Sequence, residues 1–198
     1  MSKNIIRTLF LALGAVFALL LLFVGIGGYF ITCPAPIDEW GTTWVKPTDE
    51  AALSLDNKIE TLKQEIDEAA AGAELTLVIT EEEATSKLDQ LARDGNLSVE
   101  MEYLQIYLSE GMVRAFAKVD MGIDVQVAIQ AKIEVEDGKP DITIERLNLG
   151  RIPIPKTLIN NVMTALEREL EGRWEALPVT LQDVTIEDSA MTITLVKE

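Results

Sequence analysis

A strict alternation of apolar and polar residues after Gly122 constrains the fold of this chain more than any other feature. Every odd-numbered residue from Ile123 to Val135 is apolar, whereas the even-numbered positions carry Asp, Gln, Ala, Lys and Glu. Successive side chains of a strand point to opposite faces, so the pattern predicts one buried and one solvated face, as in antiparallel sheets. A strand of this length exceeds the usual span of about 3–10 residues, and long strands twist strongly. We therefore expect a long antiparallel sheet that bends around another element.

Shorter patterns on both sides of this strand complete an antiparallel α+β domain. Thr80 and Glu83 form a capping-box sequence, which opens a helix that ends near residue 94. Glutamates 81–83 fit this helix start, where carboxylates stabilise the dipole, better than they fit a metal cluster. Gly111 and Gly138 mark turns between strands. The expected order is helix, strand, helix, four strands, helix and two strands, with the strands at 75–79, 97–108, 112–120, 123–136, 142–149, 179–186 and 191–195.

In two of these strands the apolar residues shift between even-numbered and odd-numbered positions along the strand; we call this shift a parity change. Ile142 and Ile144 share one face, whereas Leu147 and Leu149 fall on the other. A β-bulge near Glu145 or Arg146 would restore all four residues to the same side. A second parity change occurs across residues 182–183, and it predicts another bulge there.

Residues 150–174 combine two prolines with a helical pattern. Pro153 and Pro155 exclude a continuous helix or a central strand, Pro155 can open the following helix, and Gly172 ends it. At about 100° per residue, the apolar side chains cover an arc of about 140°, wider than the stripe of an ordinary surface helix. These side chains are Leu158, Ile159, Val162, Met163, Leu166 and Leu170.

Two interpretations of this wide apolar helix stay open. It is either an ordinary core helix on a sheet, or a helix cradled by a curled sheet with room beside it for an apolar ligand. In the second case, the candidate lining consists of helix residues that face the long strand. These residues are Leu158, Val162, Met163 and Leu166, opposite Val125, Val127 and Ile129.

Residues 9–31 contain no charged residue, and this run exceeds the about 20 residues that span a bilayer as a helix. It is too long for the apolar region of a cleaved signal peptide, which has about 7–15 residues. Lys3 and Arg7 precede the run and acidic residues follow it, so the positive-inside rule places residues 1–8 in the cytoplasm. We expect a single-pass protein of the cell membrane, with a transmembrane helix at 9–31, a stalk at 32–47 and an extracytoplasmic domain at 73–198.

Between the stalk and this domain, residues 48–72 predict an amphipathic helix with Thr48 as its N-cap. Its apolar residues follow heptad-like spacing for about two heptads. They are Leu55, Ile59, Leu62, Ile66 and Ala69. The helix either packs on the protein's own domain or forms a short homodimer seam through residues 48–71.

Composition excludes several classes of function. The formal net charge of −16 opposes binding to nucleic acid, which needs clustered Lys and Arg. The chain has no histidine, so the commonest general base and metal ligand are missing. Cys33 is the only cysteine, which excludes an internal disulfide and a Cys-based zinc site. We find no catalytic or nucleotide-binding motif, and we expect neither enzyme activity nor a metal or cofactor.

Three short runs resemble a known family: Val-Ile-Thr-Glu-Glu-Glu-Ala at 78–84, Val-Glu-Asp-Gly-Lys at 135–139 and Leu-Asn-Leu-Gly-Arg-Ile-Pro-Ile-Pro at 147–155. They are similar to runs in membrane-anchored YpmS-type proteins of bacteria and in LmeA-like envelope proteins. The resemblance covers roughly residues 74–196 together with the anchor. It implies a tubular lipid-binding (TULIP-like) fold, in which a long bent sheet wraps around a long helix.

These features favour a membrane-anchored envelope protein that binds or transfers a membrane lipid or another apolar molecule. Burial would drive the binding, since each CH₂ removed from water contributes about 0.8 kcal/mol. The alternative is a protein-interaction or structural module of the envelope with a packed core and no ligand.

Overall fold

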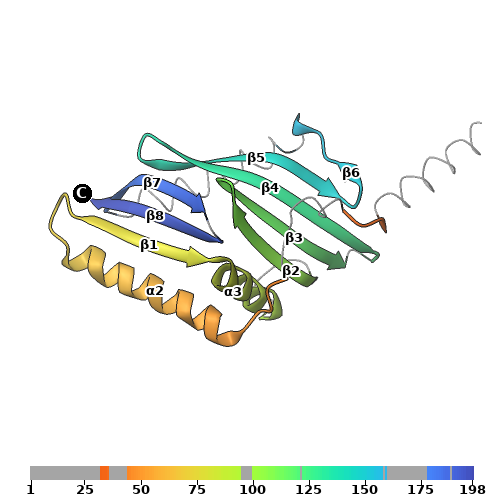
Figure 1. Ribbon diagram of the computed structural model, residues 1–198, viewed down its shortest axis with the longest axis horizontal. Coiled ribbons are helices and arrows are strands. Elements are labelled where there is room, and N and C mark those ends of the chain that lie inside the picture. The colour runs from red at the N-terminus through yellow and green to blue at the C-terminus, as the bar shows by residue number, and fades with distance from the viewer. Residues whose placement is uncertain are drawn as a thin grey trace, which may run out of the picture.

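In the part of the chain that it describes, the computed structural model has an α+β fold with two antiparallel sheets, against which the helices α2 and α3 pack (Figure 1). It describes residues 32–35, 44–94, 100–120, 122–157, 159, 178–187 and 189–198. The described elements follow the order expected from the sequence, with one additional short strand. They are α2 (Asp49–Glu68), β1 (Glu74–Thr80), α3 (Glu81–Arg93), β2 (Glu100–Ser109), β3 (Met112–Asp120), β4 (Asp124–Glu136), β5 (Lys139–Leu149), β6 (Ile152–Pro153), β7 (Val179–Glu187) and β8 (Ala190–Lys197).

The larger sheet has the order β2-β3-β4-β5-β6, and every neighbouring pair is antiparallel. Its β5 carries the predicted bulge, because Arg146 pairs with Gln130 whereas Ile144 pairs with the next residue, Ala131. Glu145 is the extra residue. The bulge returns Leu147 and Leu149 to the face of Ile142 and Ile144, as their parity change requires.

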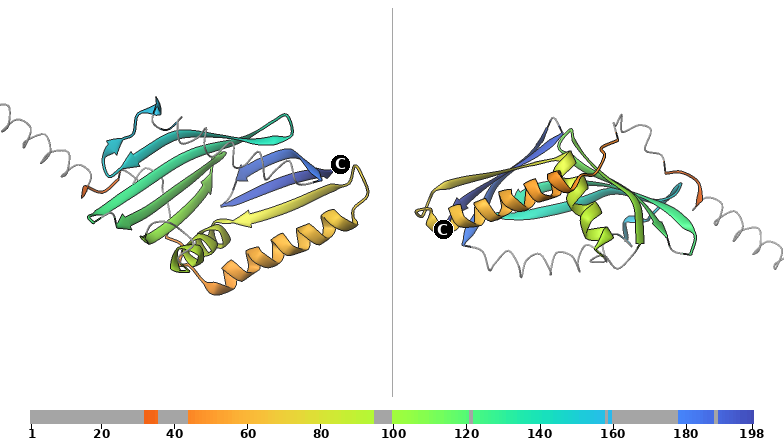
Figure 2. Two further views of the ribbon diagram at one scale, coloured as in Figure 1. Left: turned by 180° about the vertical axis from the view of Figure 1, so that it is seen from behind. Right: turned by 90° about the horizontal axis from the view of Figure 1, so that it is seen from below.

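The smaller sheet has the order β1-β8-β7, and it also contains its predicted bulge. Leu181 pairs with Leu195 and Asp183 with Thr194, so Gln182 is the extra residue. Two hairpin tips tie this sheet to the larger one, and the sheets lie end to end (Figures 1 and 2). The Leu181 N–H donates to the carbonyl of Gly138 at 2.9 Å, and the Gly111 N–H donates to that of Ile186 at 3.1 Å.

Helix α2 begins after its predicted N-cap, since the Thr48 hydroxyl accepts a hydrogen bond from the Ala51 N–H at 3.1 Å. It ends at Glu68, before Gly72, because Ala69 adopts an extended conformation. The heptad-like side chains face the protein's own domain. Ile66 is buried in a cluster with residues of β7 and β8, and Leu62 packs against this cluster. A pairing of two chains through residues 48–71 stays a prediction.

Helix α3 opens with the complete predicted capping box between Thr80 and Glu83. Its apolar side packs on the sheets through Ala84 and Leu88. The helix also buries polar residues, which the hydrophobic pattern did not predict. The Ile106 N–H donates to the hydroxyl of Thr85 at 3.0 Å, and the Thr48 N–H donates to that of Ser86 at 3.0 Å.

The prediction of one solvated face is wrong for the first half of β4. Ala128, at an even position, is buried in a cluster with Ala35, Tyr107 and Phe116. The Ala35 N–H donates to the side-chain oxygen of Gln126 at 2.8 Å. Residues 32–35 and 44–47 supply this cover, because the segment before α2 lies against the polar face of the larger sheet. Toward the end of β4 the even positions Lys132, Glu134 and Glu136 are exposed, as predicted.

In the part of the chain that the structure describes, no helix has the length and hydropathy needed to cross a membrane. The predicted transmembrane helix at 9–31 lies outside the described residues, as does most of the predicted helix at 157–171. The start of the latter is described. Lys156 and Thr157 are helical, and the Ile159 N–H donates to the Pro155 carbonyl at 3.3 Å, so this helix begins at the predicted proline.

Candidate functional site

The strand side of the predicted apolar lining lies on one face of β4. Val125 is buried with 2% of its surface exposed, whereas Val127 and Ile129 are partly buried. Val127 pairs with Leu149 and Ile129 with Leu147, so this face continues onto β5. The helix side of the predicted lining lies outside the described residues; it comprises Leu158, Val162, Met163 and Leu166.

The β4–β5 apolar face is the candidate site that the sequence predicted. We define it by eight paired side chains: Val127, Ile129, Ala131, Ile133, Ile142, Ile144, Leu147 and Leu149. All eight are only partly buried. Helices α2 and α3 lie along β1 and β2 and do not cover β4 and β5 (Figures 1 and 2). A strip of aliphatic side chains therefore runs along both strands.

This face suits an aliphatic ligand, because its eight members carry no polar side-chain atom. The charged residues of the same strands, such as Lys132 and Glu134, occupy the opposite face and are exposed. The bulge at Glu145 extends the strip by bringing in Leu147 and Leu149. Binding here would be non-directional and proportional to the apolar area that the ligand covers.

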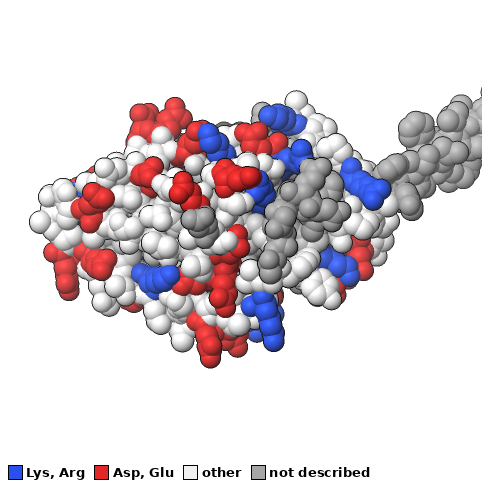
Figure 3. Space-filling model, viewed as in Figure 1, with Lys and Arg blue, Asp and Glu red and all other residues white. Residues whose placement is uncertain are grey.

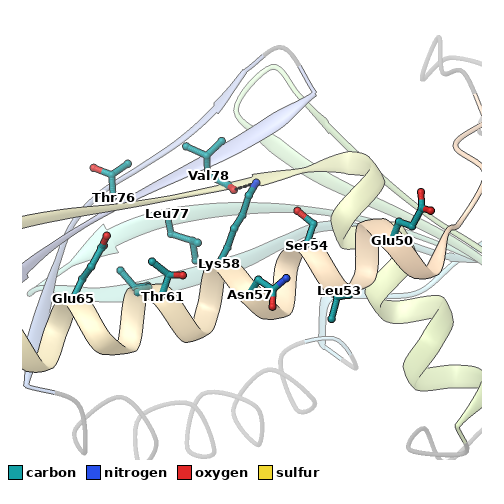
Figure 4. Close-up of a pocket in the computed structure, with 11 residues that line it drawn as sticks. Glu50, Leu53, Ser54, Asn57, Lys58, Thr61, Glu65, Thr76, Leu77 and Val78 are labelled. Carbon is teal, nitrogen blue, oxygen red and sulfur yellow. Dashed lines mark hydrogen bonds between the residues drawn. The ribbon is translucent and has the colours of Figure 1, made fainter.

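A second candidate site, which the sequence did not predict, is an open groove between α2 and β1 (Figure 4). Its volume is about 590 Å³. Leu77 points from β1 toward α2, whereas Thr76 and Val78 point away from the helix. Two large apolar side chains of the groove are exposed, Leu53 at 59% and Val78 at 41%. The sequence pattern could have indicated this exposure. Leu53 lies off the heptad-like seam of α2, and Val78 lies on the face of β1 opposite to Leu75, Leu77 and Ile79.

A buried carboxylate is hydrogen-bonded to two residues that line this groove, Ser54 and Lys58. Glu83 is 6% exposed, and its carboxylate accepts hydrogen bonds from the Lys58 ammonium at 2.8 Å and the Ser54 hydroxyl at 2.7 Å. The Thr80 N–H adds a bond of 3.0 Å. Lys58 also donates to the backbone carbonyl of Val78 at 2.9 Å, so one ammonium group joins α2, β1 and α3.

Hydrogen bonding decides the charge state of Glu83. Burial by itself raises the pKa of this carboxyl group, but the bonds from Lys58, Ser54 and the backbone outweigh burial and hold the pKa below its ordinary value of 4.5. A carboxylate with a lowered pKa is a poor general base near neutral pH. We therefore interpret Glu83 as a structural group of the helix start.

The described residues offer little to a metal or to a nucleophilic mechanism. Among them, no three or more acidic or cysteine side chains are grouped so that they can hold a metal ion. Cys33 is partly buried, and no histidine exists to activate it. The two candidate sites are therefore a sheet face and a groove, and both are suited to binding.

Scans of the chain against protein-family models and against curated proteins return no match. The function is therefore inferred from the residues and from the geometry of the domain.

Proposed function

We propose that this protein is anchored in the cell membrane by residues 9–31 and that its extracytoplasmic domain binds or transfers a lipid or another apolar ligand. The β4–β5 apolar face is the observation that carries this proposal. In this proposal the acyl chain of the ligand lies along this strip, and the helix predicted at 157–171 completes the site through Leu158, Val162, Met163 and Leu166, which lie outside the described residues. In this arrangement the bent sheet wraps the helix in a TULIP-like manner.

Three features support the proposal. The β4–β5 apolar face is long, and each of its eight side chains keeps part of its surface accessible, which supports contact with an apolar ligand. The bulge in β5 keeps the strip continuous and favours bending of the sheet. The resemblance of residues 78–84 and 147–155 to YpmS-type and LmeA-like envelope proteins agrees with lipid binding.

A photo-activatable palmitic acid, added to membranes that contain the full chain, tests the proposal. After illumination and digestion, mass spectrometry identifies the peptides that carry the label. We expect the label in residues 124–149, and we expect unlabelled palmitic acid to compete for it. Labelling confined to residues 9–31 would instead indicate contact with bulk lipid and would contradict the proposal.

Two neighbouring residues of β5 provide a matched pair of variants. Ile144 belongs to the β4–β5 apolar face, whereas Thr143 is exposed on the opposite face of the same strand. We expect I144E to lower labelling at least about tenfold, because one carboxylate in an apolar site costs more than 1.4 kcal/mol. T143E should label like the wild type. Equal labelling of both variants would favour the ligand-free interaction module.

A further inference from the structure

The edge of β1 that faces away from β8 has no neighbouring strand among the described residues. Among the described strands, β1 pairs only with β8, so its other edge is unpaired. The Val78 carbonyl points away from β8, because it accepts the hydrogen bond from Lys58. Peptide groups alternate in direction along an antiparallel strand, so those of Thr76 also point outward. An edge of this kind is a template for another strand.

The α2–β1 groove runs along this free edge (Figure 4). A strand added beside β1 would direct every second side chain toward α2, next to Leu62 and Leu77. The side chains of the added strand that point away from α2 would lie beside the exposed Val78 on the other face of β1. The Lys58 ammonium occupies one outward carbonyl, and a lysine at a sheet edge blunts unwanted pairing. If an added strand displaces the Lys58 ammonium from the Val78 carbonyl, the ammonium keeps its ion pair with Glu83.

Charge identifies the kind of strand that fits. Glu50 and Glu65 line the groove and are exposed, whereas its lysine is already paired with Glu83. Acidic residues outnumber the two lysines along α2, and Figure 3 shows acidic side chains spread along the side of the molecule where α2 lies. A second copy of this chain, with a net charge of −16, would be repelled. A segment with basic residues would be attracted.

We propose that the α2–β1 groove binds an extended segment of a partner protein, which adds a strand to the free edge of β1. The segment carries apolar residues at alternate positions and Lys or Arg at its ends. Main-chain hydrogen bonds to Thr76 and Val78 provide affinity, and the groove with its acidic rim provides selectivity.

A short synthetic peptide of alternating valine and threonine, with a lysine at each end, is the probe. The full chain in mild detergent is titrated with it, and hydrogen exchange is followed at the amides of β1. We expect saturable binding and slower exchange at Thr76 and Val78. The same peptide with glutamate ends should bind at least about tenfold more weakly, because the acidic rim repels it.

Two variants of Thr76 separate strand addition from nonspecific attraction. T76P removes only an outward N–H, and proline is tolerated on edge strands, so the domain should fold. We expect about a fivefold to tenfold loss of peptide affinity for T76P and no loss for T76A, which keeps the N–H. Glu50 and Glu65 are exposed, so the charge reversals E50K and E65K should not affect folding. With both reversals, the peptide with glutamate ends should bind more tightly than the peptide with lysine ends.

Equal affinity of T76P and T76A for the peptide would overturn the proposal, as would unchanged hydrogen exchange in β1. Self-association of the chain that T76P abolishes, with no peptide binding, would assign the edge to a second copy and would also overturn it.

Discussion

The Glu83 carboxylate is a buried charge that receives hydrogen bonds from two parts of the chain: Ser54 and Lys58 of α2, and Thr80, which ends β1 and caps α3. We expect E83Q to destabilise the domain, because the amide can no longer accept all of these bonds and leaves Lys58 without its counter-charge. Lys58 is partly exposed, so water offsets part of the loss. The expected cost is about 1–3 kcal/mol, measured by chemical denaturation.

E82Q is the matched control for this prediction, because Glu82 is the exposed neighbour of Glu83 in the same helix turn. We expect its effect to stay within about 0.5 kcal/mol. The pH dependence gives a second test. The pKa of Glu83 is lowered on folding, so its contribution is complete above its ordinary pKa of 4.5 and is lost as the pH falls through the lower folded value. The difference between wild type and E83Q should therefore shrink below pH 4.5; a constant difference would contradict this assignment.

At the scale of elements, the β4–β5 hairpin tip ties the two sheets together through Gly138. This glycine has a φ of +74°, and an added Cβ would overlap the Cγ2 of Thr180 on β7. Gly111 ends the other hairpin with a φ of +72°, and an added Cβ there would meet no atom within 4 Å. We expect G111A to cost about 1–2 kcal/mol for the left-handed backbone alone. G138A should cost about 1–3 kcal/mol more because of the overlap, measured by thermal unfolding.

A rescue experiment checks this explanation. T180S removes Cγ2 but keeps the hydroxyl that bonds to Glu198 at 2.8 Å. We expect the double variant G138A/T180S to recover the part of the loss that exceeds the cost of G111A. A loss that T180S leaves unchanged would show that the contact between hairpin and β7 does not decide the stability of this tip.

Local sequence patterns predicted most of the elements because the forces that form these elements act locally. The capping box at Thr80 and the parity changes near Glu145 and Gln182 each involve residues within a few positions of one another. Long-range contacts were not predictable in this way. The cover of the even face of β4 by Ala35, and the hydrogen bond of Thr85 to Ile106, join segments whose pairing leaves no periodic signal. The α2–β1 groove also joins two separate segments, and its local signal is limited to Leu53 and Val78, which lie off the buried faces of their elements.

At the scale of the whole molecule, the candidate sites lie on different parts of the surface and differ in chemistry. The β4–β5 apolar face belongs to the larger sheet and contains only aliphatic side chains. The α2–β1 groove belongs to the smaller sheet and has an acidic rim. Only part of the predicted lipid site is described, since β4 supplies its strand side, whereas its helix side lies outside the described residues and comprises Leu158, Val162, Met163 and Leu166. A protein with both sites can bind a ligand and a partner at the same time.

The orientation of the chain across the membrane determines which compartment both sites face. The uncharged run at 9–31 and the basic residues before it predict a cytoplasmic N-terminus and an outer domain. Cys33 is the only cysteine, so a C33S background permits labelling of single introduced thiols. Gln64 is exposed on α2 and is a suitable site in the domain. We expect a maleimide that does not cross membranes to label Q64C in intact cells and to label S2C only after the membrane is opened, with the modified fraction read by mass spectrometry. Labelling of S2C but not of Q64C in intact cells would reverse the orientation, and the lipid and partner sites would then face the cytoplasm.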